Sequence, residues 1–349
     1  MGNRSVTSYD VARRAGVSQS TVSRALRDDP RVVEKTRLRI RALAKEMGYV
    51  PHVTARSLIT RKSSTIGIVS GDLHNPSYPT LVNTLQDCFA RNDYRVLLMS
   101  DRTEGSLEKD ILALRGGLVD GVAFISSRLD SPMVSEIIDW KIPLVILNRD
   151  VDGRYAHRVD RVTSDNIGGG RLVADHLIDM GHTRIALISG PLDNPSIRMR
   201  EKGFRDRLEE RRVPIDEACV HRGAVDAATG LAGGLALLTG PDRPTAVFCA
   251  TDYIAYGTLD AAKRLDLDVP GEVSVAGYND LQQSSWSIFD LTTVRQPLED
   301  MAVAAAELLL ARIDGDEGRP VHRNFDVEWV PRGSAAPCAA PFAQSVADR

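Results

Sequence analysis

The first sixty residues contain polar side chains of the kinds that read DNA bases. Gln19 and Ser20 begin a short stretch with helical spacing, and Arg24 follows about one helical turn later. Glutamine can bind adenine through two hydrogen bonds, arginine can do the same with guanine, and serine can bond to either base type. The chemistry open to this stretch is therefore recognition in the major groove of duplex DNA, although Arg24 could instead contact a phosphate.

Three short helices are predicted to position these side chains. Thr7 with Asp10 three residues later forms a capping-box pattern, which predicts a first helix from residue 8. Gly16 permits a turn, Ser18 can cap a second helix over residues 19–26, and a third helix is predicted over residues 34–47. The inner face is supplied by apolar residues at helical spacing, namely Val11, Ala12, Ala15, Val22, Ala25, Leu26, Ile40, Leu43, Ala44 and Met47. This arrangement is typical of a minimal helix-turn-helix DNA-binding domain.

The charge of the chain is divided between a basic N-terminal part and an acidic remainder. The 349 residues carry a net charge of -3. Residues 1–62 hold 14 Lys and Arg against 5 Asp and Glu, whereas residues 63–349 hold 30 against 42. This distribution of charge predicts that only the N-terminal part binds a polyanion such as DNA. The length suits two or three domains.

Sequence patterns of enzymes, cofactors and metal sites are missing. The histidines show no HxxxH or HExxH spacing, no GxSxG elbow occurs, and the cysteines form no CxxC pair. Gly168–Gly170 lack the glycine spacing of a dinucleotide site and a Walker lysine, so tight packing of a helix against a strand is expected there. We therefore expect no catalysis, no cofactor and no metal. With no secretory signal and no apolar run near ~20 residues, we expect a cytoplasmic protein that contacts no membrane.

Beyond residue 64 the sequence alternates between short apolar runs and longer helical stretches. Strands are predicted at 66–70, 96–99, 121–125, 144–147, 185–189, 245–250, 273–277, 291–294 and 324–330. Helices are predicted at 79–91, 107–115, 133–140, 167–180, 197–210, 227–238, 253–264 and 298–313. This alternation predicts parallel sheets with crossover helices, and two successive sets predict two similar lobes. From residue 334 we expect a tail, without the leucine heptads of a coiled coil.

Several motifs of the chain resemble one family of regulators. Its N-terminal motifs are Tyr9-Asp10-Val11-Ala12, Ala15-Gly16-Val17-Ser18, Thr21-Val22-Ser23-Arg24-Ala25-Leu26, Thr36-Arg37, Gly48-Tyr49-Val50-Pro51 and Ala55-Arg56-Ser57-Leu58. They resemble the DNA-reading signature of the lactose-repressor (LacI/GalR) family. The resemblance continues through Asp165-Asn166, Gly181-His182, Arg200 with Gly203-Phe204, and Leu291-Thr292-Thr293-Val294, and covers about residues 5–333.

The resemblance implies a fold and a domain organisation. We expect an all-α helix-turn-helix DNA-binding domain at 5–51, a hinge at 52–62, and an α/β periplasmic-binding-protein-like core at 63–333. Lobe 1 would comprise about 63–163 plus 292–322, lobe 2 about 164–291 plus 323–333, and 334–349 the tail.

The resemblance also implies DNA contacts. Gln19, Ser20 and Arg24 would meet base edges, and the remaining candidates at this end of the chain are Thr7, Ser8, Tyr9, Ser18, Thr21, Arg31, Thr36 and Tyr49, mostly as phosphate contacts. In the hinge, Ala55 would permit close approach of a partner helix, and Leu58 would wedge into a minor-groove base step. The alternative is a flexible linker. One departure is Val33 before Glu34, where the family usually has a Ser or Thr cap, so the third helix should be capped more weakly.

The resemblance further implies candidate effector contacts, most of which follow strand ends, where ligands bind in parallel sheets. They are Asp72, Leu73, Asn75, Tyr78, Asn148, Arg200, Thr251, Asp252, Asn279 and Asp280. Such groups suit hydroxyls or a carboxylate, although Asp and Asn also cap helices. Many sugar-responsive members have Asp where Asn148 and Asn279 stand, and some have an aromatic residue where Val225 stands. A carbohydrate is the leading ligand class, with a sugar acid or another polar metabolite as alternatives.

Together with these residues, the resemblance implies a bacterial transcription repressor that acts as a homodimer on operator DNA under control of a small effector. The effector could either release the protein from DNA or recruit it to DNA. Two other classes of protein are alternatives. A solute receptor would explain two lobes but not the basic N-terminal reader, and an enzyme would need a nucleophile or metal set that the sequence lacks.

Overall fold

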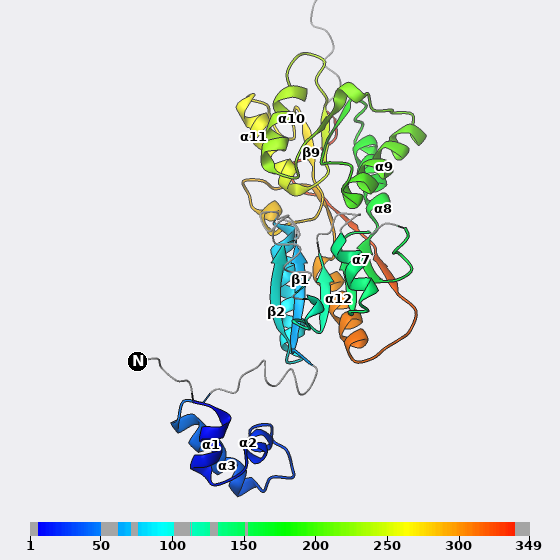
Figure 1. Cartoon of the computed structure of the whole chain (residues 1–349). Coiled ribbons are helices and arrows are strands. Elements are labelled where there is room, and N and C mark those ends of the chain that lie inside the picture. Colours follow the sequence, from blue (N-terminus) through cyan, green and yellow to red (C-terminus); the bar gives the residue numbers. More distant parts are fainter. Residues whose placement is uncertain are drawn as a thin grey trace, which may run out of the picture. The chain divides into compact units, whose positions relative to one another are not determined.

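The computed structural model describes residues 6–49, 62–70, 76–100, 112, 114–125, 132–150 and 153–338. The chain divides into two compact units, Met1–Ser63 and Ser64–Arg349 (Figure 1). No helix in the described ranges is long and apolar enough to cross a membrane.

The N-terminal unit contains three helices, α1 (Ser8–Ala15), α2 (Gln19–Leu26) and α3 (Glu34–Glu46). The predicted capping box is confirmed, since Thr7 Oγ accepts from Asp10 N and the Asp10 carboxylate accepts from Thr7 N. Gly16 ends α1 at φ 65°, a left-handed backbone that glycine adopts without steric cost. The three helices enclose one small apolar core that includes Val11, Val22 and Ile40.

The two ends of α3 have the capping that the sequence predicts. Val33 makes no side-chain cap, as expected from the missing Ser or Thr, and Glu34 in the first turn supplies a carboxylate near the positive end of the helix. Gly48 follows the helix at φ 65°. The helix is held by its apolar face rather than by its N-terminal cap.

The core unit contains two parallel sheets, each covered by helices (Figure 1). We call the part around the first sheet lobe 1. Its strand order is β11-β5-β4-β3-β1-β2, with β1 (Thr65–Ser70), β2 (Arg95–Ser100), β3 (Gly121–Phe124), β4 (Leu144–Leu147), β5 (Asp160–Ser164) and β11 (His322–Phe325). The helices of lobe 1 are α5 (Ser77–Ala90), α7 (Pro132–Asp139) and α12 (Leu298–Ile313).

Lobe 2 is built on the second sheet, in the order β7-β6-β8-β9. These strands are β6 (Ile185–Ser189), β7 (Val220–Arg222), β8 (Ala246–Cys249) and β9 (Ser274–Ala276). The helices are α8 (Asn166–Asp179), α9 (Pro195–Glu210), α10 (Ala227–Leu237) and α11 (Asp252–Arg264), with 3-10 turns η1 (Glu217–Cys219) and η2 (Gln282–Ser285). A separate antiparallel pair joins β10 (Thr293–Arg295) to β12 (Glu328–Val330).

Four strands, β5, β7, β11 and β12, differ from the sequence predictions. β5 and β7 were not predicted, since both are short and contain charged or polar residues instead of a continuous apolar run. The strand predicted at 324–330 is wrong as one element. Residues His322–Phe325 pair with β5 in lobe 1, and Glu328–Val330 pair with β10, with Asp326 and Val327 between them. Residues 323–325 therefore lie in lobe 1, not in lobe 2. The helix predicted at 107–115 falls mostly outside the described residues.

Close packing between α8 and α9 explains Gly170, whereas Cβ atoms at Gly168 and Gly169 would meet the side chains of Asp165 and Tyr278. A Cβ atom at Gly170 would lie 2.1 Å from the Arg200 carbonyl oxygen, and one at Gly203 would lie 2.1 Å from the Ile167 carbonyl oxygen. The expected packing against a strand is wrong for Gly170, because its close neighbour is the backbone of a helix. These glycines set how near α9, which carries Arg200, lies to α8.

We predict that Gly170→Ala destabilises the core unit by about 1–3 kcal/mol, because the added methyl group forces the α8 and α9 backbones apart. Gly153→Ala is the matched control. A Cβ there has no neighbour within 4 Å, so the change should stay within about 0.5 kcal/mol. Urea unfolding measures both variants, and equal stability of Gly170→Ala and the native protein would contradict the packing argument.

Candidate DNA interface and effector cleft

The first turn of α2 presents a cluster of small polar groups. Ser18 caps the helix by accepting from Thr21 N, and its Oγ lies 2.8 Å from both Ser20 Oγ and Thr21 Oγ1. Gln19 Nε2 donates to Ser8 Oγ on α1 at 3.3 Å. Ser20 and Arg24 are exposed, while Val22 and Ala25 on the opposite face are buried. The helix can therefore offer donors and acceptors outward without disturbing its core.

The predicted phosphate contacts lie in different local environments. Tyr9 is 68% exposed, whereas Thr7, Ser8, Thr36 and Tyr49 are half-buried. Arg31 forms a two-pronged pair with Asp29, from Nε at 2.9 Å and Nη2 at 2.6 Å. This bond holds the pKa of Asp29 well below its usual range. A phosphate contact by Arg31 would have to compete with that carboxylate, which is 15% exposed.

Five predicted site residues lie outside the described residues. These are Ala55 and Leu58 of the hinge, and Asp72, Leu73 and Asn75 after the first strand of the core. Their roles stay predictions from sequence.

A small cavity of about 30 Å³ lies between the two lobes. Lobe 1 contributes Ser77, Tyr78, Asn148 and Arg149 to its wall. Lobe 2 contributes Asn194, Ser196, Ile197, Arg200, Val225, Thr251 and Asn279. Of the predicted effector contacts, the structure thus brings together Tyr78, Asn148, Arg200, Thr251 and Asn279. The volume suffices for only about one or two water molecules, so a larger ligand requires the lobes to separate.

Arg200, which is 3% exposed, donates three hydrogen bonds around the cavity. Nε bonds to Asn166 Oδ1 and Nη1 to Ala250 O, both at 2.8 Å, and Nη2 bonds to Gln296 Oε1 at 3.0 Å. The guanidinium carbon lies 3.8 Å from the centre of the Tyr278 ring, a cation–π arrangement. Burial lowers the pKa of Arg200, and the nearby Tyr278 and Asp252 act against this shift.

Two of the three asparagines in the cavity wall, Asn148 and Asn279, have positive φ angles. Asn148 follows β4 at φ 63°, and Asn279 follows β9 at φ 127°. The value at Asn279 is far from the usual left-handed well, so the surrounding structure must impose it. Asn279 is 4% exposed, and its Oδ1 is buried without a hydrogen-bond partner among the described residues. Such an acceptor can be satisfied by a ligand hydroxyl or water.

Asp252 and Asp280, both predicted effector contacts, do not line the cavity. The fully buried Asp252 carboxylate accepts from Thr293 Oγ1 at 2.5 Å, Leu281 N at 2.8 Å and Ser284 Oγ at 2.7 Å. Burial raises the pKa of Asp252, while these bonds act to lower it. Asp280 pairs with Arg295 at 2.7 Å and Arg332 at 2.6 Å. Both carboxylates therefore hold the chain around η2 and β10 in place.

Several cavity residues were missed by the sequence predictions. Arg149 directly follows Asn148 and donates to Tyr78 Oη at 3.0 Å. Asn194 caps α9, and Ser196 Oγ donates across the cavity to Asn148 O at 3.1 Å. Gln296 donates to Ser164 Oγ at 2.5 Å, which links Arg200 in lobe 2 to β5 in lobe 1. The Asn-Pro-Ser start of α9 was the available signal, whereas Gln296 had none.

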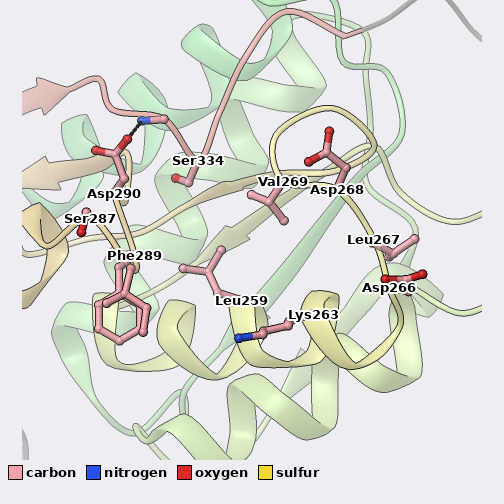
Figure 2. Close-up of a pocket in the computed structure, with 12 residues that line it drawn as sticks. Leu259, Lys263, Asp266, Leu267, Asp268, Val269, Ser287, Phe289, Asp290 and Ser334 are labelled. Atoms are coloured by element: carbon pink, nitrogen blue, oxygen red, sulfur yellow. Dashed lines mark hydrogen bonds between the residues drawn. The ribbon is translucent and has the colours of Figure 1, made fainter.

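A second hollow, of about 600 Å³, lies in lobe 2 beside α11 (Figure 2). Leu259 and Lys263 of α11 face Val269, Phe289 and Asp290 across it, and Asp290 accepts from Gly333 N at 3.1 Å. It shares no wall residue with the cavity between the lobes. It lacks a convergent set of buried polar groups, and Ile288 at its edge is 75% exposed. The wall also contains Lys263, Asp266, Asp268 and Asp290, so the exposed apolar face of lobe 2 consists only of Ile288 at this edge and the neighbouring Trp286. No group of His, Cys, Asp and Glu suited to a metal occurs within the described ranges.

Comparisons with known proteins agree with these features. Residues 7–52 match the family "Bacterial regulatory proteins, lacI family", and residues 174–335 match a periplasmic binding protein-like domain. The matches to two solved structures each span 95% of this chain and 100% of the chain in the solved structure. One is the lac repressor dimer bound to operator and an anti-inducer, at 27% identity and a TM-score of 0.84. The other is a complex of the transcriptional regulator CelR with cellobiose, at 30% identity and a TM-score of 0.74.

The ribose operon repressor of Escherichia coli (strain K12) is 33% identical over 311 residues, which cover 88% of this chain and 93% of the repressor. With an N-terminal three-helix reader and a two-lobed core of the same fold as the lac repressor, this chain belongs to the lacI family of bacterial regulatory proteins.

Proposed function

We propose that this protein is a repressor that binds operator DNA through its N-terminal unit and releases or tightens that binding when a small polar effector enters the cleft. The observation that carries the proposal is the combination, in one chain, of an exposed recognition-type helix and a polar cavity between two lobes. The bound operator and cellobiose of the two solved relatives support both halves of it. A carbohydrate or sugar acid suits the amides, hydroxyls and guanidinium groups of the wall.

In this proposal α2 enters the major groove. Ser20 and Arg24 are exposed and Gln19 is half-exposed, so these three side chains are assigned to base edges. The assigned positioning contacts are Thr7, Ser8, Tyr9, Ser18, Thr21, Arg31, Thr36 and Tyr49. The basic charge of residues 1–62 supports a polyanionic partner for this unit.

Effector and operator binding would be coupled through the arrangement of the lobes. Coupling of this kind typically changes affinity about 5- to 150-fold. Bonds that cross between the lobes at the cavity, from Ser196 to Asn148 and from Gln296 to Ser164, are the contacts that a ligand would preserve or break.

We propose that the protein acts without catalysis and in the bacterial cytoplasm, where operator DNA lies. A solute receptor is disfavoured by the N-terminal reader. Turnover of a ligand by the purified protein would instead support an enzyme.

Arg24→Ala should weaken binding to the preferred operator roughly 5- to 150-fold, because a two-pronged contact to guanine is lost. Binding to random duplex should change much less. The operator is first selected from randomised duplexes by the native protein, and affinities are measured by fluorescence anisotropy. Lys45→Ala, which removes one exposed charge from α3, is the control and should weaken all duplexes slightly and equally. If Arg24→Ala weakens binding to the operator and to random duplex equally, Arg24 contacts a phosphate. If the affinity for neither duplex changes, Arg24 is not part of the interface.

Leu58→Ala should reduce DNA bending, because the proposed wedge into the minor groove is removed. Circular-permutation gel shifts measure the bend on the selected operator. If the variant bends DNA as much as the native protein does, Leu58 is not the wedge.

We further propose that the protein is a homodimer and that the exposed apolar face of lobe 2 contributes to the dimer interface. Trp286 is 51% exposed and Ile288 75% exposed, next to the stacked rings of Tyr256 and Phe289. Large exposed apolar groups that gather on one face mark interaction sites. The lac repressor is a dimer in its operator complex, which supports a second copy as the occupant.

Ile288→Asp should raise the dimer dissociation constant at least about 10-fold, because a carboxylate would be buried in the interface. Sedimentation equilibrium gives the constant. Val321→Asp, at a 40% exposed position beside β11, is the control and should leave it unchanged. A dimer of native strength with Ile288→Asp would place the interface elsewhere.

A further inference from the structure

The loop between α2 and α3 carries two aspartates directly beside the proposed DNA-reading helix. Asp28 and Asp29 follow shortly after Leu26, the last residue of α2. The backbone N–H of Asp29 donates to the carbonyl oxygen of Arg24 at 3.1 Å, so the loop folds back against the last turn of α2. Carboxylates at this place repel the phosphates of a duplex into which α2 is inserted, unless nearby cations neutralise them.

Both aspartates are bound by arginines of the same unit. Asp28 pairs with Arg37 at 3.4 Å and with Arg41, both on α3. Asp29 binds Arg31 through both of its oxygens, since Arg31 Nε donates to Oδ1 at 2.9 Å and Nη2 donates to Oδ2 at 2.6 Å. Part of the positive charge of the basic N-terminal part is therefore paired within the protein.

The pair of Asp29 and Arg31 joins a fixed carboxylate to an accessible guanidinium. The Asp29 side chain is 15% exposed, whereas that of Asp28 is 59% exposed. Asp29 Oδ1 also accepts from the backbone N–H of Arg31 at 3.0 Å, which holds the carboxylate in place. The Arg31 side chain, in contrast, is 72% exposed. An anion from outside can therefore reach the guanidinium while Asp29 stays beside it.

A DNA phosphate and the Asp29 carboxylate offer Arg31 the same kind of bond. A guanidinium binds carboxylate and phosphate oxygens alike, through a pair of N–H donors. Arg31 already gives Nε and Nη2 to Asp29, so a phosphate must take these donors away from the carboxylate. Ion pairs at exposed positions typically shift an equilibrium by no more than about 5-fold. The pair is thus weak enough for DNA to break, but breaking it lowers the affinity for DNA.

We propose that Asp29 competes with DNA phosphates for Arg31 and thereby limits the sequence-independent part of the affinity of the N-terminal unit for duplex DNA. This inference rests on the proposed function, in which this unit binds operator DNA. Phosphates carry no sequence information, so Asp29 lowers the affinity for operator and for random duplex by the same factor. A larger share of the remaining affinity then comes from the base contacts of α2.

Asp29→Asn in the full chain tests the proposal, because asparagine keeps an acceptor for the Arg31 N–H but carries no charge. The affinity for the selected operator and for a random duplex, measured by fluorescence anisotropy, should rise about 3- to 10-fold at about 0.1 M salt. The slope of log affinity against log salt should become steeper by up to about 0.9, since one more phosphate is neutralised. An unchanged affinity, or a gain confined to the operator, would overturn the proposal.

Arg31→Ala, made both in the native chain and together with Asp29→Asn, separates competition for Arg31 from simple charge repulsion. If Asp29 holds the guanidinium, loss of Arg31 should weaken random-duplex binding at least about 3-fold more in the Asp29→Asn background than in the native chain. Equal losses in the two backgrounds would show that Asp29 acts only as a repelling charge, and the proposal would then be wrong.

Glu46→Gln is the matched control, since it removes one negative charge from the same unit. Glu46 is exposed at the last residue of α3 and forms no ion pair among the described residues, so its replacement releases no arginine. The affinity for either duplex should change less than about 2-fold. A gain equal to that of Asp29→Asn would assign the effect to net charge alone and contradict the competition for Arg31.

The proposed function and the role of Asp29 fail in different ways. A native chain that binds no duplex at low salt would contradict the proposed function. A native chain that selects an operator, combined with an Asp29→Asn variant of unchanged affinity, would overturn only the competition by Asp29.

Discussion

The arrangement of the core depends on Arg200, a buried cation at the junction of the two lobes. Its three hydrogen bonds reach the start of α8 at Asn166, the end of β8 at Ala250 and the segment after β10 at Gln296. Gln296 continues the connection to Ser164 on β5 of lobe 1. The close approach of α8 and α9 at Gly170 and Gly203 fixes the position of α9, and therefore of Arg200, relative to α8. A change at the guanidinium therefore acts on contacts of both lobes at once.

Asp252 is a second buried charge close to the same strand ends, but its environment differs. Its oxygens accept from donors on three residues of two segments, so the carboxylate is satisfied within the protein. Those donors belong to Leu281 and Ser284 around η2 and to Thr293 on β10, all of which follow Asn279 in the sequence, while the backbone N–H of Asp252 donates to the Tyr278 carbonyl just before it. Asp252 thereby helps to hold Asn279 at φ 127°, where a free chain would rarely place it. Asp252 thus supports a wall residue from outside the cavity, whereas Arg200 is itself part of the wall.

The periodicity of the sequence was sufficient to predict the long helices and the continuous apolar strands, because their burial repeats along the chain. It failed for β5 and β7, whose pairing depends on neighbours far away in sequence. At the site, strand ends indicated Asn148, Thr251 and Asn279 and the family motif indicated Arg200, and all four residues line the cavity. They could not indicate side-chain direction: Asp252 turns toward Thr293, 41 residues away, and Arg149 turns toward Tyr78, 71 residues away. These directions are set by tertiary packing, so motif position alone could not show that the Asp252 carboxylate is bonded to η2 and β10 or that Arg149 lines the cavity.

A ligand can shift the arrangement of the lobes only by the difference between its affinities for the two arrangements. A molecule bonded to one lobe has nearly the same affinity whether the lobes are together or apart, and so it shifts little. A molecule bonded to both lobes makes its full set of contacts in only one arrangement. The cavity wall takes Tyr78 and Asn148 from lobe 1 and Arg200 and Asn279 from lobe 2, so a ligand that contacts both sides distinguishes the two arrangements. Tyr78 accepts from Arg149 and Arg200 donates to Gln296, so a ligand that displaces Tyr78 or Arg200 also changes these bonds. Affinity and conformational response are then consequences of the same contacts.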